Sequence, residues 1–236
     1  MFIKLFKLKI ILGLIGFSIL NACQTESGNS DTPPSSKEEV DSSIVEAPAT
    51  HNYVPERWIW QKPELVMDLL GDMTDKTVAD IGAGLGYFSL ALAQKAKKVI
   101  AIDINQGQLD FLEQEKRRIL PERFQDRIET RLVPPDDPKI ESEEADLILI
   151  VNTYIYLPNR VEYMRRLRDN LPEGGKILIV NFKKKRIISP PGILMPLAED
   201  RVSLYKVEGE MSKAGFTILL SDDTSLDYQY IVLVEK

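Results

Sequence analysis

The sequence predicts an α/β domain with a doubly wound, mostly parallel seven-stranded sheet and an antiparallel C-terminal strand. From about residue 51 onward, short β-branched runs alternate with amphipathic stretches of helical period, which is typical of βαβ units. The run Leu147–Val151 is entirely apolar, as expected for a strand covered by helices on both faces. The last two apolar runs are too close in sequence for a crossover helix, so they are expected to pair antiparallel.

The first half of the domain is expected to alternate helices and strands. Pro63 suits the first turn of a helix, and the apolar residues that follow share one face as far as Met73. An Ala- and Leu-rich helix follows Gly86, and Gln106–Leu120 has the pattern of another amphipathic helix. Short runs rich in β-branched residues predict three strands: Thr77–Ile81, Val99–Ile104 and the weaker Ile128–Val133.

The second half continues this alternation. Asn159–Leu171 places apolar residues on one face and arginines on the other, and Pro172 with the glycines after it ends this helix. Another helix ends at Ala214–Gly215. Apolar and β-branched runs predict the remaining strands: Ala145–Asn152, Lys176–Asn181, Phe216–Leu220 and Tyr228–Val234.

The first fifty residues are expected to be a leader and a tether. Lysines at positions 4, 7 and 9 precede an apolar run, Ile10–Leu20, which is short for a transmembrane helix. The following Leu20-Asn21-Ala22-Cys23 resembles a bacterial lipobox, which implies cleavage after residue 22 and lipidation, including palmitate, at Cys23. We therefore expect a lipoprotein signal peptide at 1–22, a lipidated cysteine and disordered acidic tether at 23–50, and the folded domain at 51–236. The alternatives are a plain signal peptide and an uncleaved anchor helix.

Composition and charge favour a small-molecule partner. The formal net charge of the 236-residue chain is -6 and its pI is near 5.1, which argues against a nucleic-acid partner. Cys23 is the only cysteine and His51 the only histidine, so we expect no intramolecular disulfide, no metal site and no Ser-His relay. The other expected partner is a membrane of the bacterial cell envelope, reached through the lipid anchor. The oligomeric state is not predicted.

The most informative segment joins the first strand to the helix after it. Gly82, Gly84 and Gly86 have the spacing G-x-G-x-G, whereas dinucleotide folds use G-x-G-x-x-G to receive a pyrophosphate. Asp80, just before the first glycine, would repel a pyrophosphate and attract a cationic group. Asp103 ends the second strand, where a carboxylate can accept hydrogen bonds from both ribose hydroxyls. The pattern therefore favours a nucleoside that carries a positive charge.

From about Tyr53 to the C-terminus, the chain resembles class I S-adenosylmethionine-dependent methyltransferases, which have a Rossmann-like fold. The glycine turn and Asp103 match the first two motifs of that family. Several segments resemble one bacterial group within it: Arg57–Pro63, Ala79–Phe88, Pro135–Pro138, the Tyr154 region, Leu171–Gly175, Ala214–Phe216 and Tyr228–Tyr230. The resemblance implies S-adenosylmethionine as the cofactor.

The same resemblance implies which residues bind the cofactor. These are Asp80, Gly82, Ala83, Gly84 and Gly86 around the methionine part, Asp103 and Ile104 at the ribose and the adenine edge, Asp136 or Asp137 near the adenine amino group, and Asn152 at the end of the fourth strand.

The resemblance further implies methyl transfer by in-line displacement to an unidentified small-molecule acceptor. Because the sulfonium of the cofactor already activates the methyl group, the protein must mainly align the acceptor and exclude water. Where the bacterial group often carries Tyr-His-His, this chain has Tyr154-Ile155-Tyr156, so any imidazole role there is lost. If the acceptor needs deprotonation, the candidate catalytic bases are carboxylates or tyrosines such as Tyr154, Tyr156 or Tyr87, each of which can also be simply a wall of the pocket. Trp58 and Trp60 are expected either to cover the pocket or to pack against the sheet.

Export and cofactor supply are in conflict, because S-adenosylmethionine is not expected outside the cytosol. Two other interpretations therefore stay open: an exported, non-catalytic nucleoside-binding module that keeps the pocket, and a Rossmann enzyme that uses a nicotinamide cofactor. The two acids and three glycines of the turn favour a working pocket. Lys183–Arg186, after the fifth strand, is expected to be a solvated loop or to contact an anionic substrate or lipid head group.

Overall fold

The computed structural model describes residues 55–190, 193 and 195–236. The predicted signal peptide, Cys23 and the predicted tether lie outside the described residues. Within the described residues, no helix has both the length and the apolar character needed to cross a membrane.

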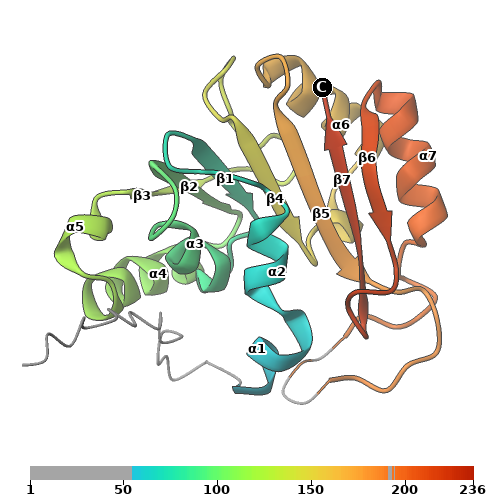
Figure 1. Cartoon of the computed structure of the whole chain (residues 1–236), viewed down its shortest axis with the longest axis horizontal. Helices are drawn as coiled ribbons and strands as arrows, with labels where there is room; N and C mark the ends of the chain where they lie inside the picture. Colours follow the sequence, from blue (N-terminus) through green and yellow to red (C-terminus); the bar gives the residue numbers. More distant parts are fainter. Residues whose placement is uncertain (1–54, 191–192, 194) are drawn as a thin grey trace, which may run out of the picture. The chain divides into compact units, whose positions relative to one another are not determined.

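The described residues form one seven-stranded sheet with the order β3-β2-β1-β4-β5-β7-β6 (Figure 1). The strands are β1 Thr77–Ile81, β2 Lys98–Asp103, β3 Ile128–Leu132, β4 Leu147–Val151, β5 Lys176–Phe182, β6 Thr217–Asp222 and β7 Gln229–Glu235. Only β7 runs antiparallel to its neighbours, β5 and β6, and the other pairs are parallel. The predicted fold class is therefore confirmed.

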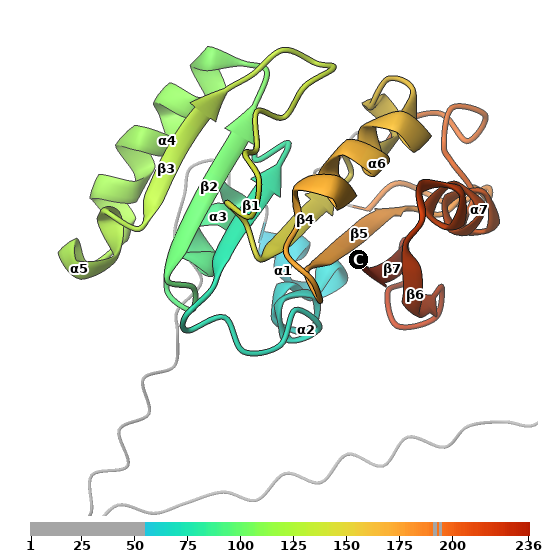
Figure 2. The same cartoon turned by 90° about the horizontal axis from the view of Figure 1, so that it is seen from above.

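Helices cover both faces of this sheet. They are α1 Pro55–Gln61, α2 Pro63–Asp68, α3 Tyr87–Leu92, α4 Gln106–Ile119, α5 Glu122–Gln125, α6 Arg160–Asn170 and α7 Leu204–Ala214, with a 3₁₀ turn at Tyr154–Tyr156. Along β4, Ile148 and Ile150 belong to the core under α6 and α7, whereas Leu147 and Leu149 belong to the core under α2, α3 and α4. This alternation explains why the whole strand is apolar. Figure 2 shows α6 on one side of β4 and β5, and α1 and α2 on the other.

The strand order reverses at β1, and this reversal positions the site. The chain passes from β1 to β2 and β3 on one side, then crosses to β4 on the other side of β1. Helices that follow β1 and β4 therefore leave in opposite directions, which opens a crevice at the carboxyl ends of these strands.

The N-terminal helices and one lysine differ from the sequence-based predictions. The predicted helix Pro63–Met73 ends at Asp68, and Gly71 adopts a left-handed φ of 77° shortly after it. A further helix, α1, precedes it and is separated by Lys62, whose φ of 47° avoids the right-handed region that a following proline disfavours. Lys183, predicted to lie in a solvated loop, is buried and donates from Nζ to the Leu226 carbonyl at 2.6 Å.

We expect Gly86→Ala to lower the free energy of unfolding by about 1–3 kcal/mol. Gly86 has a φ of 87°, and an added Cβ would lie 2.2 Å from Cδ1 of the fully buried Leu112. Gly209→Ala is the matched control, because Gly209 lies inside α7 with no atom within 4 Å of its added Cβ. That variant should gain about 0.5–1 kcal/mol. Urea unfolding followed by circular dichroism measures both, and equal shifts in the two variants would contradict this account.

Candidate active site

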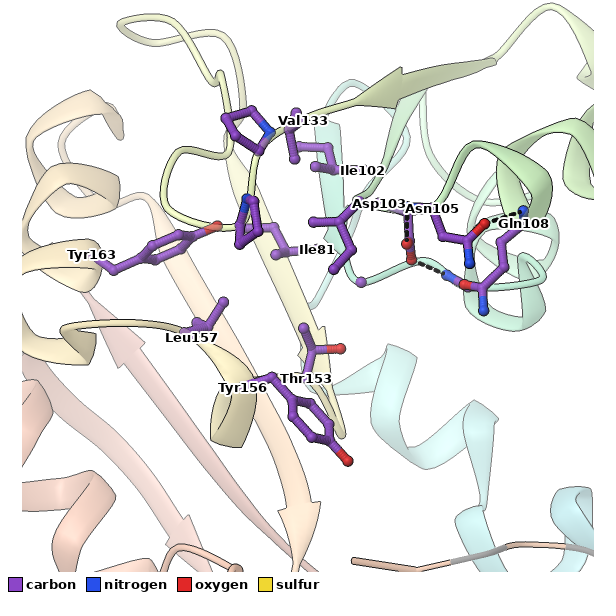
Figure 3. A pocket seen from close by; sticks show the side chains of 15 residues that line it. Ile81, Ile102, Asp103, Asn105, Gln108, Val133, Thr153, Tyr156, Leu157 and Tyr163 are labelled. Atoms are coloured by element: carbon purple, nitrogen blue, oxygen red, sulfur yellow. Dashed lines mark hydrogen bonds between the residues drawn. The ribbon is translucent and has the colours of Figure 1, made fainter.

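A pocket of about 380 Å³ lies at the carboxyl ends of β1 to β4 (Figure 3). This volume falls within the roughly 300–1,000 Å³ that is typical of small-molecule sites. The residues that line it are Ile81, Gly82, Gly84, Ile102, Asp103, Ile104, Asn105, Gln108, Val133, Pro134, Pro135, Thr153, Tyr156, Leu157 and Tyr163. Of the predicted cofactor-binding residues, it therefore contains Gly82, Gly84, Asp103 and Ile104.

Each glycine of the turn after β1 has its own reason to lack a side chain. Gly82, Gly84 and Gly86 all have left-handed φ values, of 79°, 57° and 87°. A Cβ on Gly82 would lie 2.0 Å from Oγ1 of Thr153, so this glycine lets the loop after β4 approach closely. A Cβ on Gly84 would meet only Gln108 Oε1, at 3.6 Å, so the backbone of Gly84 is open to the pocket.

Asp103 connects the glycine turn to the start of α4. Its Oδ2 accepts from the Gly84 N–H at 2.8 Å, and its Oδ1 accepts from the Asn105 N–H at 2.9 Å (Figure 3). Each oxygen keeps free lone pairs, and the side chain lines the pocket. A carboxylate held in this way can accept hydrogen bonds from a pair of ribose hydroxyls, as the resemblance implies.

Apolar side chains form the part of the pocket beyond Asp103. Ile104 is 61% exposed although it is large and apolar, which is expected of a surface that a flat ring covers when bound. Val133 and Leu157 are buried and also line the pocket (Figure 3). The open glycine backbone, the carboxylate and the apolar wall together fit a nucleoside with an amino-acid tail.

The structure places Pro134 and Pro135, not the two acids after them, in the pocket. Asp137 accepts from the Lys139 N–H at 2.9 Å and pairs with its ammonium group, and the Asp136 carbonyl accepts from Arg166. Neither acid lines the pocket.

Asp80 lies beneath the glycine turn and does not line the pocket. Its side chain is buried at the end of β1, and its Oδ2 accepts from the Ser89 hydroxyl at 2.6 Å. Burial, with a smaller contribution from the nearby charge of Asp103, raises the pKa of Asp80 to about 6 although the Ser89 hydrogen bond lowers it in part. Ala83 and Gly86 also belong to the turn without lining the pocket.

Asn152 and the buried Gln229 form a polar pair beside the pocket. Asn152 follows β4 with a left-handed φ of 57°, and its Oδ1 accepts from Gln229 Nε2 at 2.8 Å. Gln229 is fully buried, and its Oε1 has no partner within the described residues. Asn152 itself does not line the pocket, but Thr153, the next residue, does.

The two candidate tyrosines occupy different environments. Tyr154 is fully buried, and its hydroxyl donates to Glu210 at 2.7 Å, while Arg160 donates to the same carboxylate. Burial, together with the hydrogen bond to Glu210, raises the pKa of Tyr154 well above its usual value. Tyr156 is exposed and lines the pocket. Only Tyr156 is therefore placed to contact a substrate.

The motif Arg57-Trp58-Ile59-Trp60-Gln61 forms α1, and the structure explains Trp60. Its ring centre lies 6.1 Å from that of Phe182 and 5.8 Å from that of Tyr228, so Trp60 packs against β5 and the start of β7. Sequence reasoning assigned no role to Arg57, Gln61 or Gln229. The segments that resemble the bacterial group contain all three, and this is the signal that could have indicated them.

We expect Asp80→Asn to stabilise the protein at pH 8 and to have little effect at pH 4. The pKa of Asp80 is about 6 in the folded protein and about 3.9 in an unfolded chain, so the folded state binds the proton more tightly. Stability therefore falls as the pH rises through this window, and asparagine avoids the loss, by about 1–3 kcal/mol. Urea unfolding at both pH values measures the gain. Asp110→Asn, on the exposed surface of α4, is the control, and a pH-independent gain for Asp80→Asn would refute the explanation.

Comparisons with known proteins agree with this geometry. A family model described as a methyltransferase domain matches residues 79–177. Ribosomal RNA small subunit methyltransferase A of Koribacter versatilis is 33% identical over 113 residues, which are 48% of this chain and 33% of that protein. Aklanonic acid methyltransferase DauC of a Streptomyces species is 25% identical over 144 residues, 60% of this chain and 64% of that protein.

A solved structure of similar fold is an S-adenosylmethionine-dependent methyltransferase from Aquifex aeolicus. It superposes with a TM-score of 0.68 at 19% identity, and the match covers 76% of this chain and 92% of that one. The chain spans about a third of the first curated relative and about two thirds of the second. Residues 79–177 therefore match a methyltransferase domain, the fold is that of class I methyltransferases, and both findings indicate S-adenosylmethionine as the cofactor.

Proposed function

We propose that this protein transfers a methyl group from S-adenosylmethionine to a small-molecule acceptor by in-line displacement. The observation that carries the proposal is the arrangement of Asp103 and Gly84. A carboxylate with free lone pairs and an open glycine backbone face one pocket at the point where the strand order reverses. This arrangement suits a ribose and a tail that passes along the turn.

The cofactor, when bound, supplies a methyl group that its sulfonium charge has already activated. The residues of the chain then need to bind, orient and exclude water. Thr153 and Tyr156, after β4, border the pocket, so an acceptor that enters on this side meets their side chains. Asp80 contributes a buried negative charge beneath the turn, which favours the positive charge of the methyl donor.

Charge and architecture support a small-molecule acceptor over RNA. The formal net charge is -6, whereas proteins that bind nucleic acids present basic surfaces. Figure 1 shows α1 beyond the arrowheads of β4 and β5, where it covers part of the edge that an acceptor must approach. Aklanonic acid methyltransferase is, by its name, a methyltransferase of a small molecule, and ribosomal RNA methyltransferase A is one of RNA. The acidic charge of this chain favours an acceptor of the first kind.

We further propose that a lipid on Cys23 anchors the protein to a membrane of a bacterial cell envelope. The lysines, the short apolar run and Leu20-Asn21-Ala22-Cys23 support this proposal, together with the absence of any other cysteine in the chain. The second candidate function, an exported nucleoside-binding module without turnover, is favoured by the same leader, because export separates the domain from its methyl donor.

Titration calorimetry of the full-length protein tests the nucleoside site. We expect binding of S-adenosylmethionine and S-adenosylhomocysteine but not of NAD. Asp103→Ala should weaken binding by about 1–3 kcal/mol, because charged hydrogen bonds are lost. Gly84→Val should block the pocket, whereas Gly174→Val is the control, since Gly174 has a similarly left-handed φ of 73° away from the pocket.

The outcomes of this titration separate the candidate functions. Binding of NAD alone, or unchanged affinity in both pocket variants, would contradict the methyltransferase site. Binding of the methyl donor without transfer to any compound in a cell extract, followed with a labelled methyl group and mass spectrometry, would favour the non-catalytic module.

The lipid anchor has a separate test. Cys23→Ser should either release the protein from the membrane fraction or leave the precursor uncut, because serine cannot form the thioether to the lipid. Cell fractionation and the mass of the mature protein measure both. An unchanged membrane fraction together with an unchanged mass would indicate an uncleaved anchor helix.

A further inference from the structure

Three consecutive cations follow β5 on the surface of the domain. Lys184, Lys185 and Arg186, here called the basic segment, are all exposed, and none of them pairs with a carboxylate in the described part of the chain. Lys184 Nζ donates to the Glu199 carbonyl at 2.9 Å, which leaves its charge without a counter-ion. Because the whole chain carries a formal net charge of -6, three unpaired positive charges in a row are a local feature that indicates an anionic partner.

The backbone of the basic segment is held in place by Arg201. The side chain of Arg201 is buried, and its Nη1 donates to the carbonyls of Lys183 and Lys185, at 3.2 and 3.1 Å. Its Nε donates to the Pro196 carbonyl at 2.8 Å, which ties the segment to a later part of the loop before α7. The cations therefore extend from an ordered backbone, so that binding of a partner costs less conformational entropy.

Lys183 is attracted to the acidic turn between β6 and β7 and is not part of the basic segment. Its Nζ donates to the Leu226 carbonyl in that turn, and the aspartates Asp222, Asp223 and Asp227 attract it electrostatically. Asp223 and Asp227 are exposed, so an anionic surface would repel the turn. Contact with such a surface is therefore confined to the basic segment and the residues directly beside it.

Large apolar side chains are exposed next to the basic segment. Ile188 is 90% exposed, whereas Ile187, before it, packs against the buried cluster that contains Trp60. The arrangement on α1 is similar, because Ile59, the residue before Trp60, is 72% exposed. Apolar side chains beside several cations are typical of surfaces that bind at the interface of a membrane, where the apolar group enters the head-group region.

The basic segment lies at the end of the sheet where the described chain begins. Figure 1 shows the loop after β5 and helix α1 at the same end, beyond the arrowheads of β4 and β5. Helix α1 begins at Pro55, 32 positions after Cys23 (55 minus 23), and a chain of this length spans at most roughly 110 Å. An anchor on Cys23 would therefore keep this end of the domain within reach of the membrane, at a high local concentration.

We propose that the basic segment and Ile188 dock the domain on the surface of an anionic lipid membrane. The three cations bind the phosphates of the head groups, and Ile188 enters the interface between the head groups and the acyl chains. The pocket lies at the carboxyl ends of β1 to β4, and the basic segment follows the carboxyl end of β5, so docking turns this edge of the sheet toward the membrane. The inference rests on the proposed lipid anchor, which brings the chain to a membrane, and does not depend on methyl transfer.

A fluorescent reporter beside Ile188 tests the docking. Full-length Ser189→Cys protein carries a polarity-sensitive dye on the introduced thiol and is reconstituted in vesicles of phosphatidylcholine, either alone or with an equal part of phosphatidylglycerol. We expect the dye emission to move to shorter wavelength only in the anionic vesicles, and to return at high salt, because salt screens exposed charges. Labelled protein without the substitution gives the background from Cys23. Ser212→Cys, at an exposed position near the end of α7, is the control and should show no change.

A charge variant identifies the groups that bind the head groups. The variant combines Lys184→Gln, Lys185→Gln and Arg186→Gln in the reporter protein. It should lower the ratio of docked to undocked domain in the anionic vesicles by about 10- to 100-fold. The control variant makes the same change of net charge at three exposed cations near the amino ends of strands: Lys97, Arg117 and Lys213. It should change the ratio by less than about twofold, because these charges lie far from the docked surface.

A second variant tests the apolar contact. Ile188→Ser should lower the same ratio by about 3- to 10-fold, because an apolar side chain no longer leaves water on docking. Leu219→Ser is the matched control, since Leu219 on β6 is also exposed and apolar, and this variant should leave docking unchanged.

The results separate the docking surface from the anchor on which it rests. Unchanged dye emission in anionic vesicles, or equal losses in the charge variant and its control, would overturn the docking surface. The same emission change with free glycerol phosphate and no vesicles would also overturn it, because the basic segment would then bind a soluble anion. Protein that stays with neither kind of vesicle at high salt would contradict the proposed anchor alone, and the response of the dye to added anionic vesicles at low salt would still decide the docking.

Discussion

The carboxylate of Asp103 determines the geometry of the functional edge. Its two oxygens accept the N–H groups of Gly84 and Asn105, so one side chain fixes the glycine turn after β1 and the start of α4. Asn105 in turn caps α4 through its own side chain, which accepts from the Gln108 N–H. Because both bonds come from backbone groups, the carboxylate is oriented before any ligand arrives, and ligand binding does not need to order it.

Asp80 shows that this edge is built at a cost to stability. The carboxyl group of Asp80 is buried with one hydroxyl partner, Ser89, and its raised pKa reports the unfavourable environment of the charged form. Arg57 lies close enough to affect it without forming an ion pair. Departures of this kind from the usual rules of burial are concentrated at functional sites. The two charges are therefore better explained by a ligand than by the fold.

Local sequence patterns predicted the sheet and the central part of the site. β1 was predicted at its observed bounds, Thr77–Ile81, because a short apolar run between turn residues is a local signal. Asp103 was predicted to face the site because it ends the second strand, and the carboxyl end of that strand lies beside the glycine turn after β1. The start of α2 at Pro63 was predicted because proline suits the first turn of a helix, whereas the short helix α1 before it was missed.

The directions of several side chains at the site depend on contacts that local sequence patterns do not reveal. The direction of the Tyr154 hydroxyl depends on Glu210, 56 residues later in the chain. In the same way, Asp137 is turned away from the pocket by its bonds to Lys139, so that Pro134 and Pro135 line the wall in its place. The sequence favoured Asp136 and Asp137 as partners of the adenine amino group because of their residue type. Only the folded loop shows that Pro134 and Pro135 face the pocket instead.

Helix α1 links the two ends of the site. With seven residues it is too short to be stable alone, so its position depends on tertiary contacts. Trp60 supplies one contact, against Phe182 and Tyr228 near β5 and β7, and Arg57 supplies another, against Tyr87 beside the glycine turn. The helix therefore crosses from the strand that holds the nucleoside turn to the strands on the far side of β4. Loss of either contact would therefore free the helix at that end of the site.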